Sequence, residues 1–562
     1  MSLRRRLRIA MRGSLYQLPP ALQHHIGAAK RTLLRQFDWA NSIERLRLEE
    51  ADYINNTAAH NRRQPQRKKI AIYSLQHWSP VEYGLAMALH LRGHDVYGIL
   101  CDGLLPLCEM NLGPNIRPPC DACSQNLSRY ETAFGFDYER LKNYLTNDDL
   151  TAAELLIVNT PDDDLLDLKV NNIPVGLFGQ REIQRYYRGF VFEPQLDPAF
   201  RKWLVSAVLH TWLSERWLDR VQPEIVGVCS GRTLPTACIF TVAKQRGVPV
   251  VTWDGAATRA DSLMFAHNES ATEIPLDELW KTYRDVPLSA VELHELETFM
   301  GAWSRSEVTP FPYNTRPLED EASIRQQLGL RNNAPLVVAY TNTSWDIAVI
   351  DRDVGFESMF DWLFAVVEAA DSHPEMDFVV RAHPAEKRTP AELQSRTPVG
   401  PELRNRFQLP SNLKIIEGDD PISSYTLASM ARVNMLYASR LGLELALKGT
   451  RPWIAGAVTY RDKGFTFDLK SKAHLFESLK NIAQPDGLSD NQVQLAQRFA
   501  YLWFYRYELR LPLLHPADKR FSLRSFTELG PGGNETIDSL CEAFVSGGPF
   551  VELTQKQLIL SR

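Results

Sequence analysis

The chain has 562 residues, of which 44% are hydrophobic and 23% are charged, and its formal net charge at pH 7 is -5. This length exceeds what one hydrophobic core usually supports, so we expect two large domains with additional segments. The charge balance gives no general sign of nucleic-acid binding. No stretch approaches the roughly 18 apolar residues that a membrane span requires, and no signal-peptide core is visible, so we expect a cytoplasmic protein.

Residues 1–67 are predicted to form a basic N-terminal arm. Its first 36 residues contain many arginines and lysines and no acidic residue, and Leu3, Leu7 and Ile9 are interleaved with them. Such a segment can lie as a helix on an anionic lipid surface, to which each cation adds about 1 kcal/mol. We therefore expect a peripheral location on the inner face of the plasma membrane. A solvated tail is the alternative interpretation.

Residues 68–304 are predicted to form the first α/β domain. Apolar strand patterns alternate with a helical pattern that ends at Gly93, which is typical of βαβ units in a parallel sheet. The predicted strands are 69–73, 95–100, 224–228 and 248–253, and the predicted helices between them are 80–92 and 234–246.

After a linker at 305–334, residues 335–485 repeat this alternation and are predicted to form a second α/β domain. Its strands are expected at 336–340, 378–380, 413–416, 433–437 and 452–454. Residues 486–562 are expected to form helices that pack back on the first domain. Two doubly wound domains of this kind face a cleft and bind ligands at the carboxyl ends of their strands.

The strongest candidate site follows the predicted strand 378–380, where the sequence reads Arg381-Ala382-His383-Pro384. Arginine offers paired donors to phosphate, and histidine donates to an oxygen or acts as an acid. About 55 residues later, Ser439 and Gly442 open a predicted helix and suit an anion. Glu444 lies one turn further on and suits sugar hydroxyls, or it stabilises the helix dipole. A loop at the same edge carries Tyr460, Lys463 and Gly464.

Several motifs occur in a fixed order over 335–470: Thr341–Asp346, which contains Asn342; Arg-x-His-Pro-x-Glu; Ile422–Leu427; Ser-x-x-Gly-x-Glu; and Tyr460–Thr466. This succession resembles the nucleotide-sugar half of capsule polysaccharide biosynthesis proteins. They belong to the GT-B glycosyltransferases, a group that includes bacterial Kdo transferases and sialyltransferases. The resemblance implies two Rossmann-like domains and phosphate contacts from His383 and Ser439. By the same analogy, Arg381, Gly442, Glu444, Tyr460, Lys463, Gly464, Asn342 and Asp346 are expected to bind the nucleotide-sugar.

The resemblance also implies a catalytic carboxylate in the first domain, within an acidic-acidic-Gly motif. This chain has Trp253-Asp254-Gly255 there, so only the second acid is present. Asp254 as a base would take a proton from the acceptor hydroxyl. The alternative is that Asp254 only stabilises a turn or caps a helix. His77 and Arg232 follow other strands of this domain and are expected on the acceptor side.

Four cysteines, Cys101, Cys108, Cys120 and Cys123, lie within one Pro- and Gly-containing stretch. Four thiolates can close a tetrahedral structural zinc site. Four reduced thiols without metal are the main alternative, and an iron–sulfur cluster or a redox pair are others.

Together these features predict a glycosyltransferase that transfers a sugar from a nucleotide-sugar to a growing surface polysaccharide or glycolipid. Analogy suggests a CMP-linked acid sugar as the donor. Protein cations are expected to neutralise the leaving nucleotide, so no cofactor is expected for catalysis. A CDP-glycerol-type polyol-phosphate transferase and a catalytically inactive GT-B scaffold in a polysaccharide assembly complex are the alternatives.

Overall fold

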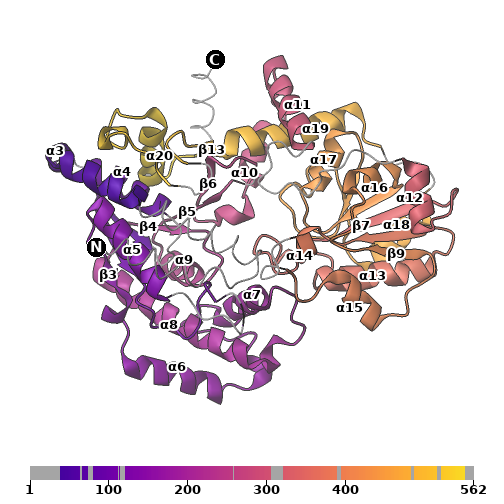
Figure 1. Cartoon of the computed structure of the whole chain (residues 1–562), viewed down its shortest axis with the longest axis horizontal. Coiled ribbons are helices and arrows are strands. Elements are labelled where there is room, and N and C mark those ends of the chain that lie inside the picture. Colours follow the sequence, from indigo (N-terminus) through magenta and orange to yellow (C-terminus); the bar gives the residue numbers. More distant parts are fainter. Residues whose placement is uncertain are drawn as a thin grey trace, which may run out of the picture.

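The computed structural model describes residues 38–63, 66–73, 80–111, 113, 120–256, 258–304, 320–388, 394–482, 487–515 and 520–550. Two α/β lobes lie side by side (Figure 1), one drawn mainly in indigo to magenta and the other mainly in orange. Each lobe is built on its own sheet, of seven and six strands respectively. The predicted fold class, two Rossmann-like domains, is therefore confirmed.

The seven-stranded sheet has the order β13-β6-β5-β4-β1-β2-β3. Strands β1 to β5 run parallel, whereas β6 runs antiparallel to β5 and β13 antiparallel to β6. The bounds are β1 Lys69–Tyr73, β2 Asp95–Leu100, β3 Glu139–Arg140, β4 Ile225–Cys229, β5 Val250–Gly255, β6 Ser262–His267 and β13 Leu509–Arg510.

Strand β1 shows why both faces of this sheet are covered. Ile70 and Ile72 belong to one apolar cluster, and Ala71 and Tyr73 belong to another on the opposite face. Alternate side chains of a strand point to opposite faces, so an uninterrupted apolar run requires helices on both sides. One cluster includes side chains of α4 (Val81–Leu91), α5 (Cys120–Phe134) and α20 (Glu535–Ser546); the other includes α6 (Asn147–Asn159), α7 (Val175–Tyr187), α8 (Pro198–Val221) and α9 (Thr236–Gln245).

The six-stranded sheet has the order β12-β11-β10-β7-β8-β9, and its neighbouring strands pair in parallel. Its strands are β7 Leu336–Tyr340, β8 Asp377–Arg381, β9 Leu413–Ile416, β10 Val433–Leu436, β11 Pro452–Ile454 and β12 Phe467–Asp468. Its helices are α12 Glu321–Leu328, α13 Met359–Ser372, α14 Ala385–Arg388, α15 Val399–Arg406, α16 Ser424–Met430, α17 Leu441–Leu447 and α18 Lys472–Lys480.

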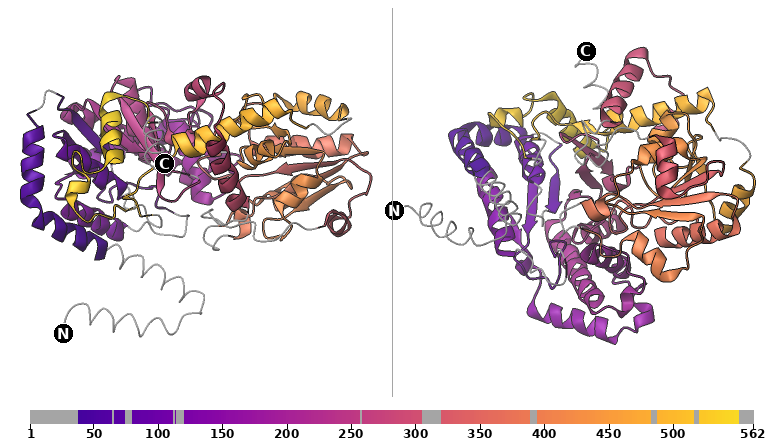
Figure 2. Two further views of the ribbon diagram at one scale, coloured as in Figure 1. Left: turned by 90° about the horizontal axis from the view of Figure 1, so that it is seen from above. Right: turned by 45° about the vertical axis from the view of Figure 1, so that its right-hand side comes forward.

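The C-terminal part of the chain contacts both lobes. Helix α19 (Asp490–Tyr501) packs on α17 of the second domain, and a π-helical turn leads from it to β13 in the first sheet. Figure 2 shows this segment, orange to yellow, running along the second domain and across to the first. Helices α10 (Asp277–Tyr283) and α11 (Ala290–Ser304) also contact α19, and α3 (Ala51–Asn61) packs on α4.

Within the described ranges, no helix combines the length and the apolar character needed to cross a membrane. The basic residues 1–36 of the predicted membrane-surface segment lie outside the described residues.

Candidate functional site

A cavity of about 390 Å³ lies between the two domains. On the side of the second domain it is lined by residues that follow the carboxyl ends of β7, β8 and β10, which meet at one edge of a parallel sheet. The first domain contributes Thr272 and Glu273 from the short turn Ala271–Glu273 and Ile274 directly after it, and α11 contributes Trp303. Six of the predicted nucleotide-sugar residues line this cavity: Asn342, Asp346, Arg381, His383, Ser439 and Glu444.

His383 is held in one tautomer by the turn that follows β8. The backbone N–H of Ala385 donates to His383 Nδ1 at 3.1 Å, so the proton of the neutral ring is on Nε2. Burial, together with the nearby Arg381 guanidinium, lowers the pKa of His383 to about 4. The imidazole is therefore neutral at pH 7. It can donate a hydrogen bond from Nε2 to a ligand oxygen, but it is not charged for acid catalysis.

Arg381 is also at the cavity, but its guanidinium is largely engaged by the protein. Its Nη1 donates to the carbonyl of Glu417, and its Nη2 donates to those of Asp420 and Ile422 at 3.2 and 3.3 Å. The side chain is 2% exposed, and burial lowers its pKa to about 10. This geometry holds the loop after β9 in place and does not present the paired donors that a bidentate phosphate contact needs.

The Ser439–Glu444 segment forms one wall of the cavity. Ser439 Oγ accepts from the N–H of Leu441 at 3.3 Å, at the start of α17. The Glu444 carboxylate accepts from the Tyr425 hydroxyl at 2.5 Å and from Trp303 Nε1 at 3.1 Å, so it fixes two aromatic rings of the wall. Gly442 does not line the cavity. A Cβ at this position would lie 2.2 Å from the Tyr460 hydroxyl, so glycine is needed for close packing.

The remaining predicted donor-site residues divide between the cavity wall and other positions. Asn342 Oδ1 accepts from the N–H of Ala438 at 3.1 Å and ties the ends of β7 and β10 together. Asp346 Oδ1 accepts from the N–H of Ala348 at 2.9 Å within a turn of the wall. Three residues do not line this cavity: Tyr460 is buried and donates to the Ser439 carbonyl, Lys463 pairs with Asp277, and Gly464 adopts a φ of +93°.

Asp254 lies near the carboxyl end of β5 but does not line the cavity. Its Oδ2 accepts from the Thr272 hydroxyl at 2.5 Å, and its Oδ1 accepts from the N–H of Gly255 at 2.7 Å. Since Thr272 does line the cavity, Asp254 stands behind the wall and contacts it through this hydroxyl. His77, the other residue expected on the acceptor side along with Arg232, lies outside the described residues.

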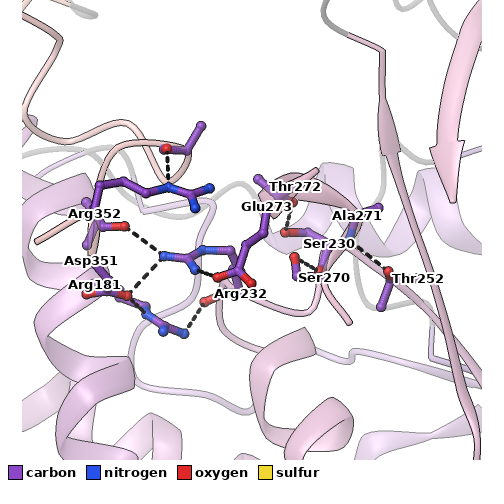
Figure 3. A network of polar contacts seen from close by, with 12 residues as sticks. Arg181, Ser230, Arg232, Thr252, Ser270, Ala271, Thr272, Glu273, Asp351 and Arg352 are labelled. Atoms are coloured by element: carbon purple, nitrogen blue, oxygen red, sulfur yellow. Dashed lines mark hydrogen bonds and ion pairs between the residues drawn. The ribbon is translucent and has the colours of Figure 1, made fainter. Parts of the chain in front are cut away.

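Arg232 follows β4 and joins the two domains. Its guanidinium pairs with Glu273 of the first domain, and with Asp351 of the second at 3.0 Å; Nη2 also donates to the Ile350 carbonyl at 2.8 Å. Arg181 of α7 pairs with the same Asp351 carboxylate at 2.5 Å. Figure 3 shows these side chains together with Arg352, and beside them the hydroxyl contacts that hold the turn carrying Glu273.

Three charged residues of the cavity wall were not among the predicted site residues: Glu273, Arg352 and Arg440. The Arg440 guanidinium lies 4.5 Å from the centre of the Trp303 ring, in a cation–π contact. Its position inside the Ser-x-x-Gly-x-Glu motif is a sequence signal that could have identified it. Glu273 and Arg352 stand in no such motif, and only the meeting of the two domains places them at the cavity.

The four clustered cysteines line a separate small cavity together with Glu109 and His210. Burial raises the pKa of Cys101 to about 11 and that of Cys108 to about 12, so both are thiols at neutral pH. In the part of the chain that the structure describes, no group of three or more His, Cys, Asp or Glu side chains could hold a metal ion. The zinc interpretation thus finds no support in this arrangement, and elemental analysis of the purified protein can test it.

No family model matches the sequence, and no curated protein matches it. Among solved structures, the chain is similar to KpsC beta Kdo 2,7 transferase from Thermosulfurimonas dismutans, with 15% identity over 56% of this chain and 87% of that chain and a TM-score of 0.32. For the beta Kdo 2,4 transferase of the same KpsC, the identity is 13%, the coverage 53% and 84%, and the TM-score 0.35. The chain is also similar to UDP-GlcNAc 2-epimerase from Neisseria meningitidis, with 11% identity over 76% of this chain and 97% of that chain and a TM-score of 0.23. These TM-scores are too low to transfer a function.

Proposed function

We propose that this chain is a glycosyltransferase that binds a nucleotide-sugar in the cavity between its two domains. The observation that carries the proposal is the cavity itself, at the carboxyl ends of β7, β8 and β10, where open α/β sheets bind ligands. A neutral His383 and the guanidiniums of Arg352 and Arg440 line it. The neutral donor of His383 and the cation of Arg440 suit the phosphate groups of a nucleotide, and Arg352 lies at the edge of the cavity.

In the proposed reaction, the bond between the sugar carbon and the donor phosphate oxygen breaks, and its electron pair stays on that oxygen. Arg440, which lines only this cavity, stabilises the charge that develops there, and His383 donates from Nε2. The acceptor hydroxyl forms the new bond and releases its proton to a carboxylate. Glu273 is the carboxylate on the cavity wall of the first domain, whereas Asp254 contacts the wall only through Thr272. We assign the base role to Glu273 and a positioning role to Asp254.

The donor class is tested by the melting temperature of the full chain with CMP, CDP, UDP or GDP. A ligand at 100 times its Kd stabilises the folded state by about 2.7 kcal/mol, so the correct nucleotide raises the melting temperature. By the resemblance described above, CMP is the first expectation, with a CMP-linked acid sugar as donor. Stabilisation by none of the four nucleotides would contradict the proposal.

Product analysis then separates transfer from other reactions of a bound nucleotide. Incubation with the labelled sugar form of the stabilising nucleotide should move the label to an added glycan acceptor. With labelled CDP-glycerol, transfer of glycerol phosphate would instead identify the polyol-phosphate alternative. Nucleotide binding without any labelled product would identify the inactive scaffold.

We further propose that residues 1–36 hold the enzyme at an anionic membrane surface, where a lipid-linked acceptor would be found. The support is the sequence alone, with its many cations and no acidic residue. A chain lacking residues 1–36 should stay folded but no longer sediment with phosphatidylserine vesicles, and high salt should have the same effect on the intact chain. Equal sedimentation of both chains would overturn this part.

A further inference from the structure

A second cavity, of about 800 Å³, adjoins the first and is lined by both domains. The two cavities share a boundary made of Glu273, Ile274, Arg352, Ala457, Val458 and Thr459. We propose that this second cavity binds the acceptor, and that it recognises an anionic group, a carboxylate or a phosphate, on the acceptor sugar. That the ligand is an acceptor rests on the proposed function, whereas the anion site is inferred from the cavity alone.

The charged side chains that line the second cavity include more cations than anions. The cations are Arg181, Arg232, Lys244, Arg352, Arg461 and Lys463, and the anions are Glu269, Glu273, Asp277 and Asp462. Most of these cations already have an ion-pair or hydrogen-bond partner within the protein. Lys463 pairs with Asp277 at 2.5 Å, and both Arg181 and Arg232 use the single carboxylate of Asp351. Arg461 donates to the carbonyls of Ile454, Gly456 and Leu469, so its guanidinium supports the backbone.

Arg352 differs from these matched cations. Among the described residues, its guanidinium donates a hydrogen bond from Nε to the Ala348 carbonyl, at 3.0 Å. Burial lowers its pKa and Arg181 adds to this lowering, whereas the nearby carboxylates of Glu273, Asp351 and Asp346 partly oppose it. Figure 3 shows its terminal nitrogens beside the Arg232 guanidinium. The two guanidiniums repel each other, since Arg352 lowers the pKa of Arg232. An incoming anion would offset this repulsion and the burial of Arg352, and a guanidinium binds carboxylate or phosphate through two parallel hydrogen bonds.

Lys244 adds a second cation to the second cavity. It is exposed at the end of α9, and its Nζ lies 5.1 Å from the centre of the Phe240 ring, which also lines the cavity. No acidic partner is recorded for Lys244 within the described ranges. Because it lines the second cavity and not the first, its substitution tests the anion site without altering the donor cavity.

The position of Arg352 gives the anion site a chemical purpose. Arg352 and Glu273 both lie on the boundary between the cavities. A sugar anchored on Arg352 through its anionic group would therefore present a neighbouring hydroxyl to Glu273 and to the donor. Fixing a reactant in this way lowers the entropic barrier of the reaction. The anion site is thus a specificity site, which selects acidic over neutral acceptors.

The test uses the full chain saturated with the nucleotide that stabilises it most, so that phosphate or carboxylate probes cannot occupy the donor cavity. Calorimetric titrations compare octyl glucuronide with octyl glucoside, which differ in one carboxylate, and glucose 6-phosphate with glucose. We expect the anionic probe of at least one pair to bind about 10-fold more tightly, and the pair that shows it identifies carboxylate or phosphate. Lys244→Glu and Arg352→Gln should each remove most of this preference.

Lys202→Glu is the matched control, because Lys202 is exposed on α8 and lines neither cavity. It should leave the preference unchanged. Equal affinity for charged and neutral probes, or a preference that survives in Arg352→Gln, would overturn the proposal. The proposed function fails separately, through absence of nucleotide binding, in which case the sugar titrations are run on the nucleotide-free chain.

Discussion

Arg232 Nη2 of the first domain lies 3.0 Å from Asp351 Oδ2 of the second, in an ion pair that ties the two halves of the molecule together. The Arg232 side chain is 4% exposed, whereas that of Asp351 is 31% exposed. Arg181 approaches the same carboxylate from α7, so one acidic group on the second domain holds two guanidiniums of the first.

Replacing Asp351 with Asn should loosen this junction, because two buried or half-buried guanidiniums lose their shared charge partner. We expect a loss of about 1–2 kcal/mol after allowance for the partial exposure of Asp351, measured as a lower urea midpoint. Asp163→Asn, at an exposed position, is the control and should change the midpoint little. An Asp351→Asn midpoint equal to wild type would show that the ion pair contributes no stability.

His383→Ala should weaken binding of the stabilising nucleotide by about 10-fold, which corresponds to one lost hydrogen bond to a charged group. Burial lowers the pKa of His383 to about 4, so between pH 6 and 8 nucleotide affinity should change no more in the wild type than in His383→Gln, where only the nucleotide phosphate titrates. His383→Gln, which can keep a donor near the Nε2 position, should restore part of the affinity. A midpoint near pH 6.5 that is present in the wild-type profile and absent from that of His383→Gln would show that the imidazole titrates in the normal range.

Two substitutions, Glu273→Gln and Asp254→Asn, distinguish the proposed base, Glu273, from the proposed positioning residue, Asp254. If Glu273 takes the acceptor proton, Glu273→Gln should lower kcat by roughly 10²–10⁴ with nucleotide affinity little changed. Asp254→Asn keeps an oxygen that can accept from Thr272 and should have a smaller effect, about 10-fold or less. The reverse order of the two kcat values would return the base role to Asp254.

Glu386, in the turn after His383, gives a prediction about pH and stability. Burial raises its pKa to about 8, and its Oε2 accepts from the N–H of Val399 at 3.3 Å. Because the folded pKa exceeds the unfolded one, its contribution is fully present below about pH 4.5 and is lost as the pH rises to 8. Glu386→Gln cannot ionise, so its melting temperature relative to wild type should rise by at least ~2 °C between pH 5 and 9. Glu477→Gln, an exposed control on α18, should show no such trend.

Much of the fold could be predicted because its strands are short apolar runs bounded by turn residues. The predicted bounds are those of β1, β2, β7, β9 and β11, and they differ by one or two residues from those of β4, β5, β8 and β10. Strand β6 was not predicted. It returns antiparallel beside β5, and its apolar residues Leu263 to Ala266 carry no period that distinguishes this pairing from a helical segment.

The candidate site could be predicted only in part, for a physical reason. Sequence order places His383 and Ser439 at the ends of parallel strands, and topology then brings both to the cavity. Sequence order does not show which side-chain donors already form hydrogen bonds within the protein. Arg381 has the expected position, yet backbone carbonyls of 417–422 take its Nη groups. Glu273 and Arg352 reach the cavity through contacts between domains, which no local pattern records.

The pairing of β13 with β6 has a consequence for how the chain is made. Leu509 and Arg510 complete the edge of a sheet whose other strands end at His267. During synthesis the whole second sheet therefore emerges from the ribosome before the first sheet can close. Because domains generally fold as units while translation proceeds, the second domain can fold while the edge of β6 is still open. Until residue 510 has emerged, that edge is a place where another extended chain can pair, so the nascent protein depends on its own late strand to end that exposure.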